Sequence, residues 1–362
     1  MHLAGYKIRA WRDAHTPPLS AEEFGIRFGD PWPSRTVYGW ESKGKVARPP
    51  VQRRLADLGI CSPEDWLEPA PEQDTDNSLI VSRNDQTDRD TGDHPFFDLH
   101  QHGMVRVATS TPKTRTADID YNVEGILAEA ERAHEAGVDL VVYPELCVSS
   151  YAIDDLHLQS ALLDAAEAGV ARIVAASADI DPVLLIGAPL RHNGRVYNCA
   201  AVVARGQLLG VVPKSFLPNY REYYENRWCA HGREIRGMEI AVAGQTVPFG
   251  VDLIFAASNL SGFKLHVEIC EDYWAPTPPS TQGALAGATV LANLSASNIT
   301  IGKSDERHLL ARAQSSRAVA AYLYCASGHG ESTTDLAWDG QGMIYELGDL
   351  LAESERFSLN AE

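Results

Sequence analysis

The alternation of apolar and polar positions after about residue 100 predicts a layered α/β domain. Short apolar runs bounded by polar turns are typical of strands, and they recur at 104–108, 139–143, 183–187, 197–204, 208–212, 265–269, 290–294, 321–326 and 342–345. Apolar residues at helical spacing lie between them at 118–136, ending at Gly137, and at about 305–318. Strands interleaved with helices indicate an α/β fold in which helices cover sheets.

A different pattern, of short helices, precedes this domain as far as residue 68. Ser20 and Glu23 have the spacing of a capping box, Ser34 can cap a second helix, and an amphipathic helix is expected at 50–58. The order of these segments resembles the phage-repressor type of helix-turn-helix domain, and the resemblance is carried by LSAEEFGIRFG, SRTVYGWES and VQRRLADLGICSPEDWL. The turn between the first two segments, DPWP, is longer than is usual in that family.

The helix-turn-helix resemblance implies a set of DNA contacts. Side chains expected to face the major groove are Ser34, Arg35, Thr36 and Tyr38, and those expected on phosphates are Lys43, Lys45 and Arg48. Residues 1–60 carry ten Lys and Arg against six Asp and Glu, which supports only modest phosphate neutralisation. The alternative is a small all-α interaction module that keeps the fold without binding DNA.

Residues 69–97 separate the two regions. They are rich in Asp, Asn, Ser, Thr and Pro, and residues 70–98 carry eight acidic against two basic side chains. Such a segment buries too little apolar surface to offset the entropy of ordering it. We therefore predict a helical domain at 1–68, a flexible acidic linker at 69–97 and an α/β domain at 98–362; a long surface loop within one domain is the alternative to the linker.

Composition narrows the class of protein. A chain of 362 residues with 44% hydrophobic residues is long enough for two or more globular domains, and no apolar run is long enough to cross a membrane. The N-terminus lacks the apolar core of an export signal, and the six cysteines show no CxxC pairing. These features predict a cytoplasmic, reduced chain with no disulfides and no metal. The net charge of −18 argues against nucleic-acid binding over the whole surface.

Three short polar motifs follow predicted strands, where α/β proteins present their chemistry. Glu145 follows the strand that ends in Tyr143, and burial there suits a general base. Lys214 ends another apolar strand, where an ammonium needs a compensating anion. Cys270 ends a third strand and enters a turn. Each residue taken alone also has a structural explanation: inert core for Cys270, a helix cap for Glu145 and an extended surface side chain for Lys214.

Together and in this order, the three motifs resemble the nitrilase superfamily of carbon–nitrogen hydrolases, which uses a Glu, Lys, Cys triad. The resemblance is carried by PEL at 144–146, PK at 213–214 and EICED at 268–272, with separations of 69 and 56 residues between the triad positions. Within the superfamily the sequence is most similar to the glutaminase domain of glutamine-dependent NAD synthetases, through phrases such as YPELCVSSYAIDDL, GVVPKSFLPNYREYYE and GESTTDLAWDG. This family has an αββα sandwich fold.

The resemblance implies a mechanism and a pocket. Cys270 would attack the side-chain amide of glutamine, with Glu145 as base and with Lys214 and the backbone N–H of Glu271 stabilising the oxyanion. Glu225 matches a second carboxylate that orients this site. The glutamine pocket would be lined by Tyr151, Tyr220, Glu271, Trp274 and Ser297, and Lys303 stands where some relatives carry an arginine. A lysine there can still pair with a carboxylate but loses bidentate geometry.

The full NAD synthetase also carries an ATP-dependent domain with a glycine-rich phosphate loop, and this sequence shows no such loop. We therefore expect no cofactor and no NAD synthetase activity from this chain alone. The leading interpretation is a hydrolase of the side-chain amide of glutamine or of a related small amide. Because members of this family are usually oligomeric, we expect a homo-oligomer, with a separate synthetase as a candidate acceptor of the ammonia. The alternatives are a DNA-binding regulator whose amidase domain senses an amide, and a glutaminase half separated from its synthetase by fusion or truncation.

Overall fold

The computed structural model describes Ile8, Leu55, Ile60, residues 98–260 and residues 262–361. Apart from those three isolated positions, the predicted helix-turn-helix domain (1–68), its DNA contacts and the predicted linker (69–97) lie outside the described residues. They therefore stay predictions. In the described part of the chain, no helix is both long and apolar enough to cross a membrane.

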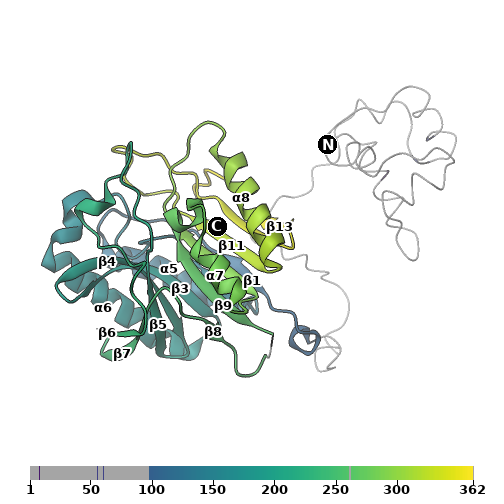
Figure 1. The fold of residues 1–362 in the computed structure, drawn as a ribbon, viewed down its shortest axis with the longest axis horizontal. Coiled ribbons are helices and arrows are strands. Elements are labelled where there is room, and N and C mark those ends of the chain that lie inside the picture. The colour runs from purple at the N-terminus through teal and green to yellow at the C-terminus, as the bar shows by residue number, and fades with distance from the viewer. Residues whose placement is uncertain (1–7, 9–54, 56–59, 61–97, 261, 362) are drawn as a thin grey trace. The chain divides into compact units, whose positions relative to one another are not determined.

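Two sheets form the centre of the described domain (Figure 1). The seven-stranded sheet found among the described residues has the order β1 (Val107–Thr109), β2 (Leu140–Val142), β3 (Val183–His192), β4 (Arg195–Ala204), β5 (Gln207–Pro213), β7 (Gln245–Phe249) and β6 (Met238–Val242). The six-stranded sheet, again among described residues, has the order β13 (Asp349–Glu353), β12 (Gly342–Glu346), β11 (Ala321–Ala326), β10 (Val290–Ser295), β9 (Lys264–Ile269) and β8 (Phe255–Ala256). Strands β1, β2 and β3 run parallel, as do β9, β10 and β11.

Helices cover the outer face of each sheet, which gives four layers in the order αββα. Helices α5 (Ile119–Glu135) and α6 (Ser160–Ala176) pack on the seven-stranded sheet, and α7 (Pro279–Leu285) and α8 (Lys303–Ala318) lie on the six-stranded sheet. Short 3-10 helices connect these layers at η3 (Leu99–His102), η4 (Asp154–Leu158), η5 (Ser177–Asp179), η6 (Glu225–Arg227) and η7 (Cys270–Trp274). The structure thus confirms the predicted αββα sandwich.

The alternation of side chains along the strands explains this layering. In β2, Val141 packs with the helix side of its sheet, whereas Leu140 and Val142 belong to the core between the two sheets. The core between the sheets also contains Leu185 from β3 and Ile269 from β9. Because both faces of the central strands are buried, their sequences read as nearly continuous apolar runs.

The bounds of the predicted elements are confirmed to within a few residues, with some omissions. Helix α5 begins after Asp118, whose side chain accepts a hydrogen bond from the backbone N–H of Tyr121, and it ends just before Gly137 as expected. Strand β1 begins at Val107 rather than at residue 104, and α8 begins at Lys303 rather than near residue 305. Helices α6 and α7 and the strands β6, β7, β8 and β13 were not predicted.

Candidate active site

The three motif residues lie at the ends of strands from both sheets. Glu145 follows β2, Lys214 comes directly after β5, and Cys270 comes directly after β9 as the first residue of η7. Strands β2 and β5 belong to the seven-stranded sheet and β9 to the six-stranded sheet, and β5 contacts β9. All three side chains are buried. The packing of the two sheets therefore brings a carboxylate, an ammonium and a thiol to one end of the sandwich.

Glu145 accepts hydrogen bonds at both carboxylate oxygens. Its Oε1 accepts from Nζ of Lys214 and from Nδ2 of Asn198, each at 2.6 Å, and its Oε2 accepts from the backbone N–H of Ala296 at 2.7 Å. Asn198 lies in β4, and its carbonyl also accepts from the backbone N–H of Lys214 at 2.8 Å. These contacts hold the carboxylate in one orientation, as a base must be held.

Lys214 lies between two carboxylates. Its Nζ donates to Oε1 of Glu145 and to Oε1 of Glu225, at 2.6 Å in both cases, and its side chain is fully buried. Burial acts to lower the pKa of Lys214, but the charges of Glu145 and Glu225 outweigh it and raise that pKa well above its usual value. Lys214 is therefore a fixed positive charge and not a proton acceptor.

Glu225, the first residue of η6, is the second carboxylate of this cluster. Its Oε1 accepts from Lys214 and also from the hydroxyl of Tyr151, at 2.6 Å. Burial raises the pKa of Glu225, while the charge of Lys214 opposes the rise. The backbone N–H of Tyr151 donates in turn to Oε1 of the buried Glu331 at 2.9 Å. The structure thus connects four of the residues singled out in the sequence: Glu145, Lys214, Glu225 and Tyr151.

Cys270 has the backbone and the surroundings of a nucleophile. Its φ of 46° lies in the left-handed region, which is uncommon for a residue other than glycine and is concentrated at functional sites. Its N–H donates to Oδ1 of Asn293 at 3.2 Å. Burial raises the pKa of the Cys270 thiol well above its usual value, the charge of Glu145 raises it further, and Lys214 opposes both. The resting thiol is therefore protonated and needs a base to become a nucleophile.

Asp272 joins the turn of Cys270 to the segment after Lys214. Its Oδ2 accepts from the backbone N–H groups of Ile269 at 3.0 Å and Ser215 at 3.3 Å, and its Oδ1 accepts from that of Phe216 at 2.8 Å. Burial raises the pKa of Asp272 to about 8. One buried carboxyl group thereby fixes the relative positions of the two motifs that carry the thiol and the ammonium.

A second polar group surrounds Lys303 at the start of α8. Its Nζ donates to Oδ1 of Asn298 at 2.5 Å and lies 5.4 Å from the ring centroid of Trp274 and 5.9 Å from that of Tyr223. Burial lowers the pKa of Lys303. None of the carboxylates in the described part of the chain forms an ion pair with it. A partly buried ammonium that lies against aromatic rings without a carboxylate partner is suited to bind an anionic group.

The remaining pocket candidates lie on the rim and wall of the same region. Tyr220, about half exposed, donates from its hydroxyl to the carboxylate of Glu271, 3.1 Å from both oxygens. Ser297 is buried, and its Oγ has no hydrogen-bond partner. The ring centroid of Tyr223 lies 6.4 Å from that of Tyr151 and 6.1 Å from that of Tyr220. Tyr223 thus connects Tyr151, which binds Glu225, to the polar residues around Lys303.

Comparison with known proteins identifies the family of this chain. The family model for carbon–nitrogen hydrolases matches residues 106–358, which is more than half of the chain. The chain belongs to the carbon–nitrogen hydrolase family. It is 58% identical over 262 residues to the glutamine-dependent NAD(+) synthetase of Mycobacterium tuberculosis, a match that covers 72% of this chain and 38% of that protein. The corresponding enzyme of Aquifex aeolicus is 30% identical, with 70% of this chain and 41% of that protein covered.

Solved structures of carbon–nitrogen hydrolases share the fold. A glutamine-dependent NAD(+) synthetase from Cytophaga hutchinsonii aligns with a TM-score of 0.64 and 29% identity, covering 71% of this chain and 42% of that one. An amidase of the nitrilase superfamily from Nesterenkonia aligns with a TM-score of 0.58 and 18% identity, covering 71% of this chain and 88% of that one, and this likeness shows the fold alone. The chain thus spans about two fifths of the synthetases that it matches.

Several residues that hold this hydrolase site in place were not recognised in the sequence. Asn198 orients Glu145, Asp272 joins two motifs, and Glu331 holds the backbone at Tyr151. Asn198 could have been recognised in the sequence as a polar residue inside the apolar stretch 195–204. Among the described residues, no group of His, Cys, Asp or Glu side chains is placed to hold a metal ion, and Cys147, Cys199, Cys229 and Cys325 are free and buried.

Proposed function

We propose that this chain hydrolyses the side-chain amide of glutamine and releases ammonia through a thioester on Cys270. The observation that carries the proposal is the buried ion cluster, in which Lys214 donates to Glu145 and Glu225 at 2.6 Å beside a thiol whose pKa responds to the charges of all three. The relatives in which this domain recurs are named for their dependence on glutamine. The arrangement supplies a nucleophile, a base and a fixed positive charge.

The proposed reaction has two halves. In the first, Glu145 takes the proton of the Cys270 thiol as the sulfur attacks the amide carbon, and Lys214 with the backbone N–H of Glu271 stabilises the oxyanion. The carbon–nitrogen bond then breaks, and Glu145 gives its proton to the leaving ammonia. In the second half, Glu145 takes a proton from water as the water oxygen attacks the thioester. The carbon–sulfur bond breaks, the thiol regains its proton, and glutamate leaves.

The residues around Lys303 support glutamine as the substrate of the proposed reaction. The ammonium of Lys303, which lacks an ion-pair partner among the described carboxylates, would bind the α-carboxylate of glutamine. Glu271, held by Tyr220 at the rim, is available for the α-ammonium group. The unpartnered Oγ of Ser297 supplies a further hydrogen bond at the wall, and Trp274 lies against the Lys303 ammonium. Simple amides lack both charged groups, so glutamine is the substrate that these charges favour.

The test is the release of ammonia from L-glutamine by the purified full-length chain. We expect turnover in the native protein and in Cys199→Ala, a control that alters another buried cysteine in the core on the helix side of the seven-stranded sheet. Cys270→Ala is expected to release none above background. A native protein that folds but turns over neither glutamine nor another amide would overturn the proposal.

The fate of the ammonia and the assembly form part of the same proposal. The synthetases that this chain resembles are longer, and their name couples glutamine to the synthesis of NAD(+). We propose that the ammonia is passed to a separate ATP-dependent synthetase and that the chain forms a homo-oligomer. Sedimentation of the purified chain, alone and with such a synthetase, tests both statements: a monomer that binds no synthetase would contradict them.

A further inference from the structure

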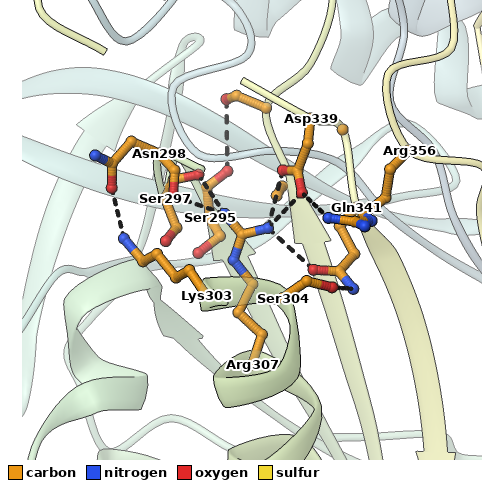
Figure 2. A network of polar contacts seen from close by, with 12 residues as sticks. Ser295, Ser297, Asn298, Lys303, Ser304, Arg307, Asp339, Gln341 and Arg356 are labelled. Carbon is orange, nitrogen blue, oxygen red and sulfur yellow. Dashed lines mark hydrogen bonds and ion pairs between the residues drawn. The ribbon is translucent and has the colours of Figure 1, made fainter. Parts of the chain in front are cut away.

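Arg307 is the largest of the fully buried side chains in the described part of the chain, and it lies next to the proposed pocket. It reaches from α8 toward the loop that follows β10, as Figure 2 shows. Its Nη2 donates to the backbone carbonyls of Ser297 at 2.8 Å and Asn298 at 2.9 Å. A single guanidinium thus binds two successive carbonyl groups of the same loop.

The opposite edge of the guanidinium is fixed as well. Its Nη1 donates to both carboxylate oxygens of Asp339 at 2.9 Å and to Oε1 of Gln341 at 3.0 Å. The side chains of Arg307 and Asp339 are fully buried, so removing Asp339 would leave the guanidinium without an ion-pair partner. Asp339 also pairs with Arg356, at 3.6 Å. The planar fork of arginine can satisfy all these acceptors at once, whereas the ammonium of a lysine cannot.

The loop that Arg307 holds carries the groups that face the proposed substrate. Asn298 accepts at its Oδ1 from the Lys303 ammonium and from the hydroxyl of Tyr223 at 2.8 Å. Ser297, whose carbonyl is bound by Arg307, keeps its buried Oγ unpartnered. In the described structure Arg307 forms no hydrogen bond or ion pair with Glu145, Lys214 or Glu225, and its bonds go to Ser297, Asn298, Asp339 and Gln341.

We propose that Arg307 is a positioning residue that sets the recognition of the amino-acid head group of the substrate, acting through Ser297 and Asn298. This inference rests on the proposed glutamine hydrolysis. By holding the two carbonyls, Arg307 fixes the backbone that carries the Asn298 side chain. That side chain, held further by Tyr223 and Glu222, contacts the ammonium of Lys303. The position of that ammonium then decides how tightly an α-carboxylate is bound, whereas the nucleophile keeps its own supports.

The test compares Arg307→Lys with Arg312→Lys, which makes the same change at an exposed position of the same helix. We would measure kcat and KM for L-glutamine, together with the rates at which two reagents alkylate Cys270. Iodoacetamide has no amino-acid head group, whereas a diazoketone analogue of glutamine has one. Circular dichroism and thermal unfolding show whether each variant is folded.

For Arg307→Lys we expect KM for glutamine to rise by about tenfold with kcat nearly unchanged, the factor for one lost hydrogen bond to a charged group. Alkylation by the diazoketone should slow by a similar factor, iodoacetamide should react at the native rate, and Arg312→Lys should match the native protein. Equal slowing with both reagents, or a fall in kcat alone, would indicate a purely structural role and overturn the inference, as would an unchanged KM.

A variant that fails to fold is replaced by Asn298→Ala, which keeps the Arg307–Asp339 pair and removes the side chain that contacts Lys303, Tyr223 and Glu222. The same rise in KM is then expected, and its absence would overturn the inference.

Failure of the proposed function itself gives a different result. In that case the native chain would react with iodoacetamide but would neither hydrolyse glutamine nor react with the diazoketone, and both proposals would fall together.

Discussion

Replacing Gly187 by alanine should displace Glu145, the proposed general base, without changing its side chain. Gly187 lies in β3, and the turn that carries Glu145 packs directly against it. An added Cβ would lie 2.3 Å from the backbone nitrogen of Leu146, 2.5 Å from the carbonyl oxygen of Pro144 and 2.8 Å from the carbonyl carbon of Glu145. All three are backbone atoms, so no side-chain rotation relieves the contact.

The size of the effect follows from these distances. Ordinary contact begins at 3.4 Å, so the turn must retreat by about 1 Å. A misplacement of about 1 Å can lower a rate by about a hundredfold, because the proton acceptor no longer meets the thiol in the reactive geometry. Overpacking of this kind also costs about 1–3 kcal/mol of stability. We therefore expect kcat/KM for glutamine to fall by about a hundredfold and the melting temperature to fall by several degrees.

The assay is ammonia release at several glutamine concentrations, with thermal unfolding of the same samples. Gly125→Ala in α5 is the matched control, because its added Cβ would meet Pro112 at an ordinary distance of 3.6 Å. Alanine also has a better helix propensity than glycine, so this control should be active and at least as stable as the native protein. Native activity and native stability in Gly187→Ala would refute the reasoning.

Three further predictions concern the supports of the site. Tyr151→Phe removes the 2.6 Å bond to Glu225, so kcat should fall by about tenfold in a folded protein, and an unchanged kcat would contradict this role. Lys303→Met removes the ammonium proposed to bind the α-carboxylate, so KM for glutamine should rise by at least about tenfold with little change in kcat. Initial-rate kinetics measure both constants, and an unchanged KM would contradict this role. Burial raises the pKa of Glu331 to about 7, from about 4.3 in an unfolded chain. The folded state therefore binds the Glu331 proton more tightly than the unfolded state, and the stability that this proton contributes is lost as pH rises toward 7. Between pH 5 and 8 the free energy of unfolding of the native protein should fall relative to that of Glu331→Gln. Urea unfolding free energies of the two proteins that change in parallel with pH would contradict this prediction.

Local patterns in the sequence were sufficient to predict the α/β fold, and they also marked the three candidate residues at the centre of the proposed site. Apolar runs marked the central strands, and a charged or thiol side chain directly after such a run marked Glu145, Lys214 and Cys270. These residues meet because strand ends from both sheets meet at one end of the sandwich. The order and spacing of the motifs supplied the family, which fixed the layers.

Other features depend on tertiary contacts that no local pattern records. Helix α6 was missed because its sequence, SALLDAAEAGVARIVAA, is rich in alanine, which gives little contrast between its apolar and polar positions. The edge strand β13 is exposed along its whole length and lacks an apolar side. Glu331 binds the backbone of Tyr151, 180 residues away, and Arg307 pairs with Asp339, 32 residues away, so only the folded chain shows these partners. The predicted helix-turn-helix domain lies outside the described residues.

The central claim is that Cys270 carries the acyl group of glutamine during turnover. The most direct test is to mix the full-length chain with L-glutamine, quench in acid within the first turnovers, and measure the mass of the intact protein and its peptides. The account predicts a mass increase of one γ-glutamyl group on the peptide that contains Cys270, absent from Cys270→Ala. Release of ammonia by the Cys270→Ala variant, or an adduct located on another residue, would contradict it.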